Sequence, residues 1–132
     1  MIVTQGTADV PATEARLRAL LAQLNVPVFA TFDHAANAKA AGLSLRPTVV
    51  LVFGNPSVGT HLMQDRQAMA LDLPLRVAIW EDEDGLIWLG YHDLRQLSAK
   101  YHVTDDVTVA KLAGFMETLI KQATEETDGS RS

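Results

Sequence analysis

The segment that most constrains the fold is an apolar run that ends in a turn rich in glycine, asparagine and proline. Residues 48–53 carry no charge, and Gly54, Asn55 and Pro56 follow them directly. A run that is apolar on both faces predicts a strand covered on both sides and therefore central in its sheet. The turn has neither the Gly-Lys-Ser/Thr of a nucleotide-binding loop nor the three glycines of a dinucleotide site. The segment therefore indicates a fold class and a candidate site, but it does not indicate a reaction.

The size and composition of the chain predict one domain. Its 132 residues are 48% hydrophobic, which is enough for one core and too little for two. We expect residues 1–124 to form this domain and the polar residues 125–132 to form a flexible tail. The net charge of −5 argues against nucleic acid as a partner, because phosphate binding needs a clustered basic surface. The absence of cysteine excludes disulfides, thiolate catalysis and cysteine-based metal sites.

The lengths of the apolar segments also indicate where in the cell the protein is located. The N-terminus has no basic region followed by a long apolar core, so we expect no signal peptide. The longest apolar run is far too short to span a bilayer. These features predict a cytoplasmic protein with no membrane partner.

The spacing of apolar residues predicts alternating strands and helices. Strands are expected at residues 2–4, 26–32, 48–53, 75–82 and 86–91, with helices after Asp9, after Asp33, near residues 58–67 and 93–101, and after Thr104 or Asp105. If the strands at 26–32 and 48–53 were parallel neighbours, Asp33 and His34 would lie near Gly54 and Asn55. An antiparallel arrangement would separate them.

Asp84-Gly85 predicts a hairpin with a type I′ turn. That turn would place Trp80 opposite Leu89 and Ala78 opposite Tyr91, with Trp88 on the other face of the hairpin. Both faces of the hairpin would then be largely apolar. A partner subunit or a ligand cavity would be needed to cover the second face.

Three spaced motifs resemble the bacterial and archaeal family known as domain of unknown function 302. They are the stretch Phe53-Gly-Asn-Pro-Ser-Val-Gly-Thr60 with Leu62-Met63, the stretch Leu71-Asp-Leu-Pro-Leu-Arg76, and Asp33-His34-Ala35, with Ala38 and Tyr91 in addition. The resemblance spans nearly the whole chain. It implies an α+β domain with a curved, mainly antiparallel sheet and helices packed on one face, similar to the TATA-box-binding-protein-like group. It also implies a dimer, but no activity, and the name of that fold does not imply DNA binding.

Five side chains are candidates for a ligand site: His34, Asn55, Thr60, His61 and Asp72. Asn55 and Thr60 could hold an anion together with backbone N–H groups, or the turn could serve backbone geometry alone. His34 could act as a base oriented by Asp33, or Asp33 could simply cap a helix. His61 could face the same cleft as Thr60. Asp72 could be a functional carboxylate or a local cap.

Taken together, these features predict a homodimer that binds a small molecule, with no cofactor and no metal. Enzymatic activity stays open but is not favoured. One alternative is a small acid–base enzyme that uses His34 and His61 with Asp33 or Asp72. The other alternative is a metal-responsive protein, although the four histidines lack the usual metal-binding spacings.

Overall fold

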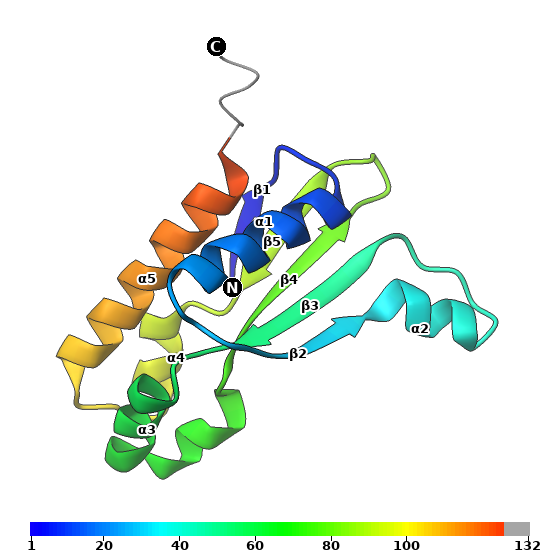
Figure 1. The fold of residues 1–132 in the computed structure, drawn as a ribbon. Helices are drawn as coiled ribbons and strands as arrows, with labels where there is room; N and C mark the ends of the chain where they lie inside the picture. The colour runs from blue at the N-terminus through cyan, green and yellow to red at the C-terminus, as the bar shows by residue number, and fades with distance from the viewer. Residues whose placement is uncertain (126–132) are drawn as a thin grey trace.

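A five-stranded sheet organises the chain in the computed structural model, which describes residues 1–125 (Figure 1). The strand order is β1-β5-β4-β3-β2, and all four neighbouring pairs are antiparallel. The strands are β1 (Ile2–Gln5), β2 (Val28–Asp33), β3 (Thr48–Phe53), β4 (Leu75–Glu81) and β5 (Ile87–Tyr91). The expected α+β fold with an antiparallel sheet is thus confirmed. The predicted tail lies outside the described residues, apart from Glu125.

Each α-helix begins at an acidic or amide side chain that accepts a backbone N–H from the first turn. These capping residues satisfy donors that have no partner within the helix, which is why the helices begin where they do. The helices are α1 (Val10–Gln23), α2 (His34–Ala40), α3 (Pro56–Asp65), α4 (Leu94–Lys100) and α5 (Asp106–Thr124), capped by Asp9, Asp33, Asn55, Asp93 and Asp105. A short 3₁₀ helix, η1 (Gln67–Asp72), follows α3.

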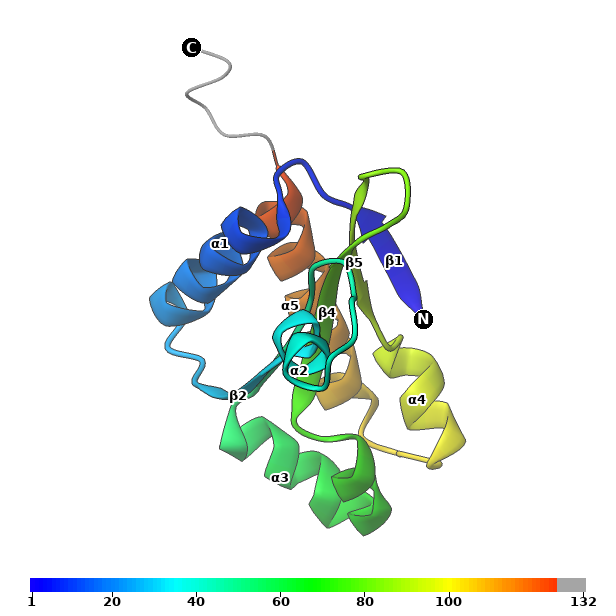
Figure 2. The ribbon, with the colours of Figure 1, turned by 90° about the vertical axis from the view of Figure 1, so that its right-hand side faces the viewer.

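The core lies between one face of the sheet and the two long helices. Helices α1 and α5 pack against each other and against this face of the sheet (Figures 1 and 2). Alternate residues of the three inner strands point into the core, and helical side chains such as Leu17 and Met116 meet them. The strand residues are Val49, Leu51 and Phe53 of β3, Leu75, Val77 and Ile79 of β4, and Ile87, Leu89 and Tyr91 of β5.

The opposite face of the sheet is not covered by α1 or α5, and we call it the open face. One row of paired residues crosses all five strands on this face: Val3, Gly90, Ala78, Val50 and Phe32. Val3 and Phe32, at the two ends of the row, are 42% and 45% exposed. The row is apolar throughout, so the open face presents hydrophobic side chains to its surroundings.

The hairpin register differs from the predicted one by one residue. Trp80 pairs with Trp88, and Ala78 pairs with Gly90. The cause is the turn, in which Gly85 has φ of +79° and the Asp82 carboxylate accepts the N–H groups of two turn residues at 2.9 Å. One left-handed glycine is typical of a longer bulged turn, whereas a type I′ turn needs two positive φ values. Both tryptophans therefore lie on the open face, and the prediction that separated them is wrong.

The parallel arrangement considered for residues 26–53 is also wrong. Strands β2 and β3 are antiparallel, with Asp33 opposite Val49 at the beginning of β3. Gly54 and Asn55 follow the other end of β3. Asp33 and His34 therefore lie at the opposite end of the sheet from the Gly-Asn-Pro turn.

Candidate functional site

The turn between β3 and α3 builds a tight helix start. The Asn55 side-chain oxygen accepts the N–H of Ser57 at 2.9 Å, and its backbone carbonyl accepts the N–H of Gly59 at 3.1 Å. Pro56 occupies the first helical position, where a missing N–H costs nothing. Gly54 is buried, and a Cβ atom there would lie 3.6 Å from Pro74. The residues of this turn thus have a structural role whether or not a ligand binds beside them.

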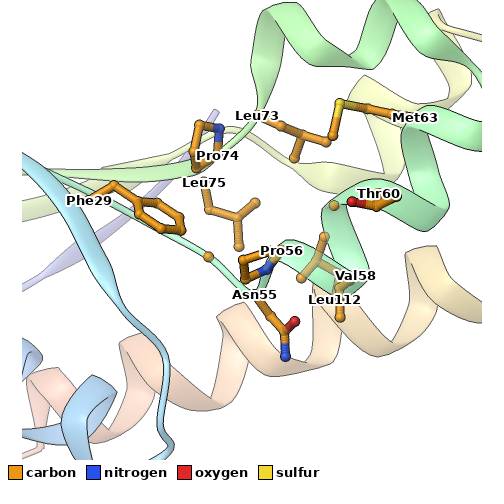
Figure 3. A pocket seen from close by; sticks show the side chains of 12 residues that line it. Phe29, Asn55, Pro56, Val58, Thr60, Met63, Leu73, Pro74, Leu75 and Leu112 are labelled. Atoms are coloured by element: carbon orange, nitrogen blue, oxygen red, sulfur yellow. The ribbon is translucent and has the colours of Figure 1, made fainter.

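A cavity of about 250 Å³ lies beside this helix start (Figure 3). Its walls come from β2, from α3 and the turn before it, from the start of β4 and the residues before it, and from α5. Its apolar side chains include Phe29, Pro56, Val58, Met63, Leu73, Pro74, Leu75 and Leu112. Asn55 and Thr60 supply the polar side chains of this lining. We call it the α3 cavity.

A second cavity of about 300 Å³ lies against the same helix start. It shares five lining residues with the α3 cavity: Gly54, Asn55, Val58, Leu75 and Leu112. Its other walls are Leu24 and Val26 before β2 and Lys111 and Phe115 on α5. In Figure 3 the Asn55 side chain points away from Leu73 and Met63. We call this hollow the α5 cavity.

His61 and Asp72 lie outside both cavity linings. His61 is exposed on α3 beside Thr60. Asp72 accepts a hydrogen bond from the Tyr101 hydroxyl at 2.5 Å. That bond raises the pKa of Tyr101, because it favours the protonated phenol beside a carboxylate. Asp72 thus joins η1 to the end of α4, and it does not cap a helix.

His34 is remote from both cavities. It is the exposed first residue of α2, and its ring stacks on Phe32 with centroids 6.3 Å apart. Neighbouring Asp33 accepts the N–H of Ala36 at 2.9 Å and caps that helix. Within residues 1–125 no histidine side chain is hydrogen-bonded to a carboxylate, and no group of three or more histidine or acidic side chains is placed to hold a metal ion.

Of the five candidate residues, the structure therefore brings Asn55 and Thr60 together and leaves His34, His61 and Asp72 elsewhere. The sequence reasoning missed the apolar lining and Lys111. Phe29, Leu73 and Leu112 have the spacing of ordinary core residues, so no local pattern marks them as cavity walls. Lys111 belongs to the exposed side of a helix far along the chain, where a single lysine carries no signal.

Across the described part of the chain, no helix is both long and apolar enough to cross a membrane. The fluoride-specific ion channel FluC 1 of Brucella suis biovar 1 (strain 1330) is 36% identical over 125 residues, which are 93% of this chain and 49% of that protein. FluC 2 of Brucella melitensis biotype 1 is also 36% identical over 125 residues, here 46% of its length. The chain thus spans about half the length of the curated relatives it matches.

The fold and the whole sequence point to one family. The crystal structure of an uncharacterized conserved DUF302 protein from Bacillus stearothermophilus superposes with a TM-score of 0.75 at 18% identity. The superposition covers 93% of this chain and 94% of that one, which shows a shared fold. The family model for the domain of unknown function DUF302 matches residues 2–123. The chain belongs to the DUF302 family.

Proposed function

We propose that this domain binds a small, mostly apolar molecule in the α3 cavity. The observation that supports it is a hollow with apolar walls and two polar side chains, the composition typical of ligand sites. The volume of about 250 Å³ is slightly below the usual range of about 300–1,000 Å³ for such sites, which points to a small ligand. A water molecule occupies about 30 Å³, so the cavity suits a ligand of roughly eight non-hydrogen atoms.

The two polar residues differ in what they can offer. The Asn55 side-chain oxygen is already used by the N–H of Ser57, which leaves its NH₂ group to donate. The Thr60 hydroxyl can both donate and accept. A ligand that carries one polar acceptor at the end of an apolar body fits this combination.

A thermal-shift screen tests the proposal, with a variant that fills the cavity. Gly59 lines the cavity, and a Cβ atom there would lie 3.9 Å from Leu73 and 4.0 Å from Met63. Gly59→Leu should block ligands, whereas Gly59→Ala is the matched control because it adds only a methyl group. A ligand present at a hundred times its Kd stabilises the wild type by about 2.7 kcal/mol, which a melting curve resolves. Hits that shift Gly59→Leu as much as the wild type would contradict the site.

We also propose that two copies pair through the open face. A sheet of five strands about 4.8 Å apart, with strands of about 17 Å, offers a footprint of about 400 Å². A stable interface needs about 800 Å² from each partner, so neighbouring segments must contribute. Helix α2 has no buried residue and extends beyond the sheet, and Leu43 and Leu45 after it are 68% and 50% exposed. We propose that this arm contributes to the interface beside the open face.

Sedimentation equilibrium tests the pairing. The wild type should be a dimer at micromolar concentration. Phe32→Glu and Val3→Glu should yield monomers, because each buries a charge in the proposed interface. Val107→Glu is the control, since Val107 is 67% exposed on α5 and lies away from the open face. A monomeric wild type at all concentrations would rule out the dimer.

The named relatives support a second candidate function, an accessory role beside a fluoride channel. Both Brucella proteins are about twice as long as the matched region, so their channel activity can reside in the remaining half. On this proposal, deleting the gene for this chain should lower the fluoride tolerance of its host. Tolerance that is unchanged, under conditions where the protein is made, would exclude the role.

A further inference from the structure

We propose that the ligand of this site is a medium-chain carboxylate, with its apolar chain in the α3 cavity and its carboxylate at Lys111 in the α5 cavity. This inference rests on the proposed ligand-binding function and names the chemical class of the ligand. It follows from how the two cavities adjoin, from the charge of their linings and from their sizes.

The two cavities adjoin along one wall. Gly54, Asn55, Val58, Leu75 and Leu112 line both of them. The proposed ligand lies across these shared residues, beside the first turn of α3. The α3 cavity is the more apolar end, and side chains such as Phe29 and Met63 line it. The α5 cavity carries the polar end.

The charge of the cavity lining favours a ligand with an acidic head group. Lys111 is the charged residue among the side chains that line the two cavities, and no carboxylate within the described residues forms an ion pair with it. Among the described residues, no acidic side chain lines either cavity. An ammonium head group would therefore be repelled by Lys111 and would have no carboxylate to pair with. The Asn55 NH₂ group, on the shared wall, is a second donor for a carboxylate oxygen. In a chain of net charge −5, this local excess of positive charge favours an anionic head.

The size of the α3 cavity sets the chain length. About 250 Å³ corresponds to roughly eight water volumes of about 30 Å³ each, which suits a tail of about six to eight carbons. Each CH₂ group buried in such a cavity should tighten binding about fourfold. The gain should stop once the cavity is full, so we expect a plateau near octanoate.

Isothermal titration at fixed ionic strength tests the class, with octanoate, octanol, octylammonium and hexanoate as probes. The variants are Lys111→Gln and, as matched control, Lys121→Gln, which alters a lysine of the same helix that lines neither cavity. We expect octanoate to bind about fivefold tighter than octanol, and Lys111→Gln to remove that preference without weakening octanol. Lys121→Gln should behave as the wild type. Hexanoate should bind more weakly than octanoate by the chain-length rule.

The outcomes separate this inference from the proposed function. If octanol binds as tightly as octanoate, or if Lys111→Gln leaves the preference intact, the carboxylate class is overturned. Octanol binding that Gly59→Leu abolishes would still support the α3 cavity as a ligand site. Tighter binding of octylammonium would also overturn the class. If none of the four probes binds, the inference fails outright. The thermal-shift screen with Gly59→Leu then tests whether the α3 cavity binds any ligand.

Discussion

The indole ring of Trp80 on β4 lies over Gly90 on β5, with no room for a side chain between them. A Cβ atom on Gly90 would be 3.0 Å from both Cζ3 and Cη2 of that ring, tighter than about nine in ten real Cβ contacts. The two residues are diagonal neighbours in the register, because Trp80 pairs directly with Trp88. Glycine at this position therefore lets the Trp80 ring pack closely on the open face, and it is not a turn residue.

Gly90→Ala should destabilise the protein by about 1–3 kcal/mol, because the added methyl group must displace the Trp80 ring. Urea unfolding measures the change. Gly114→Ala in α5 is the control, since nothing lies within 4 Å of the added Cβ, and it should stabilise by up to about 1 kcal/mol. Combining Gly90→Ala with Trp80→Leu should cost less than the sum of the two single changes, and simple additivity would contradict the contact.

Asp65 should make stability fall in acid. It accepts the N–H groups of Asp105 at 2.8 Å and Thr104 at 2.7 Å, and the bond from Asp105 is the largest cause that lowers the pKa of Asp65. Because the folded pKa lies below the unfolded one, this stabilisation is present above the ordinary carboxylate pKa of about 4 and is lost as pH falls through the folded value. Asp65→Asn should lower stability at pH 7 and reduce its loss between pH 6 and 3.

Urea unfolding at several pH values reads out this difference. Asp84→Asn is the matched control, because Asp84 lies at the exposed hairpin tip and its carboxylate accepts no hydrogen bond among the described residues. If Asp65→Asn loses as much stability in acid as the wild type does, the hydrogen bonds from Thr104 and Asp105 are not the cause of that loss.

Tyr101 should ionise at unusually high pH. Its hydroxyl donates to Asp72, and this bond is the main cause that raises the pKa of Tyr101. Stability linked to the bond is therefore present below the ordinary tyrosine pKa of about 10 and is lost as pH rises. Asp72→Asn should lower the pKa, which ultraviolet titration in a Tyr91→Phe background can follow, since Tyr91 is the other tyrosine. An unchanged titration curve would show that the bond is absent in solution.

Gly59→Ala should stabilise the protein by about 0.5–1 kcal/mol, because glycine inside a helix costs backbone entropy and the added Cβ makes only ordinary contacts. Thermal melts at equal concentration measure it. Gly42→Ala is the opposite case, since Gly42 has φ of +79° and alanine is strained there. Destabilisation by Gly59→Ala would mean that the space beside α3 is already filled.

The sequence predicts the elements of this fold better than their pairing. The expected caps Asp9 and Asp33 predicted helix starts that the structure contains. Of the alternatives Thr104 and Asp105 for the last helix, the structure has Asp105 as the cap. The hairpin register was missed because both faces of β4 and β5 are apolar, so alternation of polar and apolar residues does not fix it. The Asp82 carboxylate then decides the turn by binding two N–H groups, a choice that Asp84-Gly85 alone does not reveal.

The candidate site was predictable where backbone geometry marks it. Asn55 and Thr60 follow from a turn whose asparagine caps helix α3 and whose proline opens it, and both line the α3 cavity. Histidines and an acid carry no such positional information. His34 stacks on nearby Phe32, and Asp72 joins η1 to the end of α4 through Tyr101. The walls of the cavity depend on which helices meet, which is a property of the assembled fold.

Helix α3 is held at both of its ends. At its start Asn55 forms the wall shared by the two cavities, and at its end Asp65 holds the first backbone groups before α5. A molecule that binds at the first turn of α3 therefore restrains the whole ten-residue helix. The far end of this helix is hydrogen-bonded to the residues that begin α5. Amide hydrogen exchange at Thr104 and Asp105 should slow when the cavity is filled, which makes the beginning of α5 a remote reporter of occupancy.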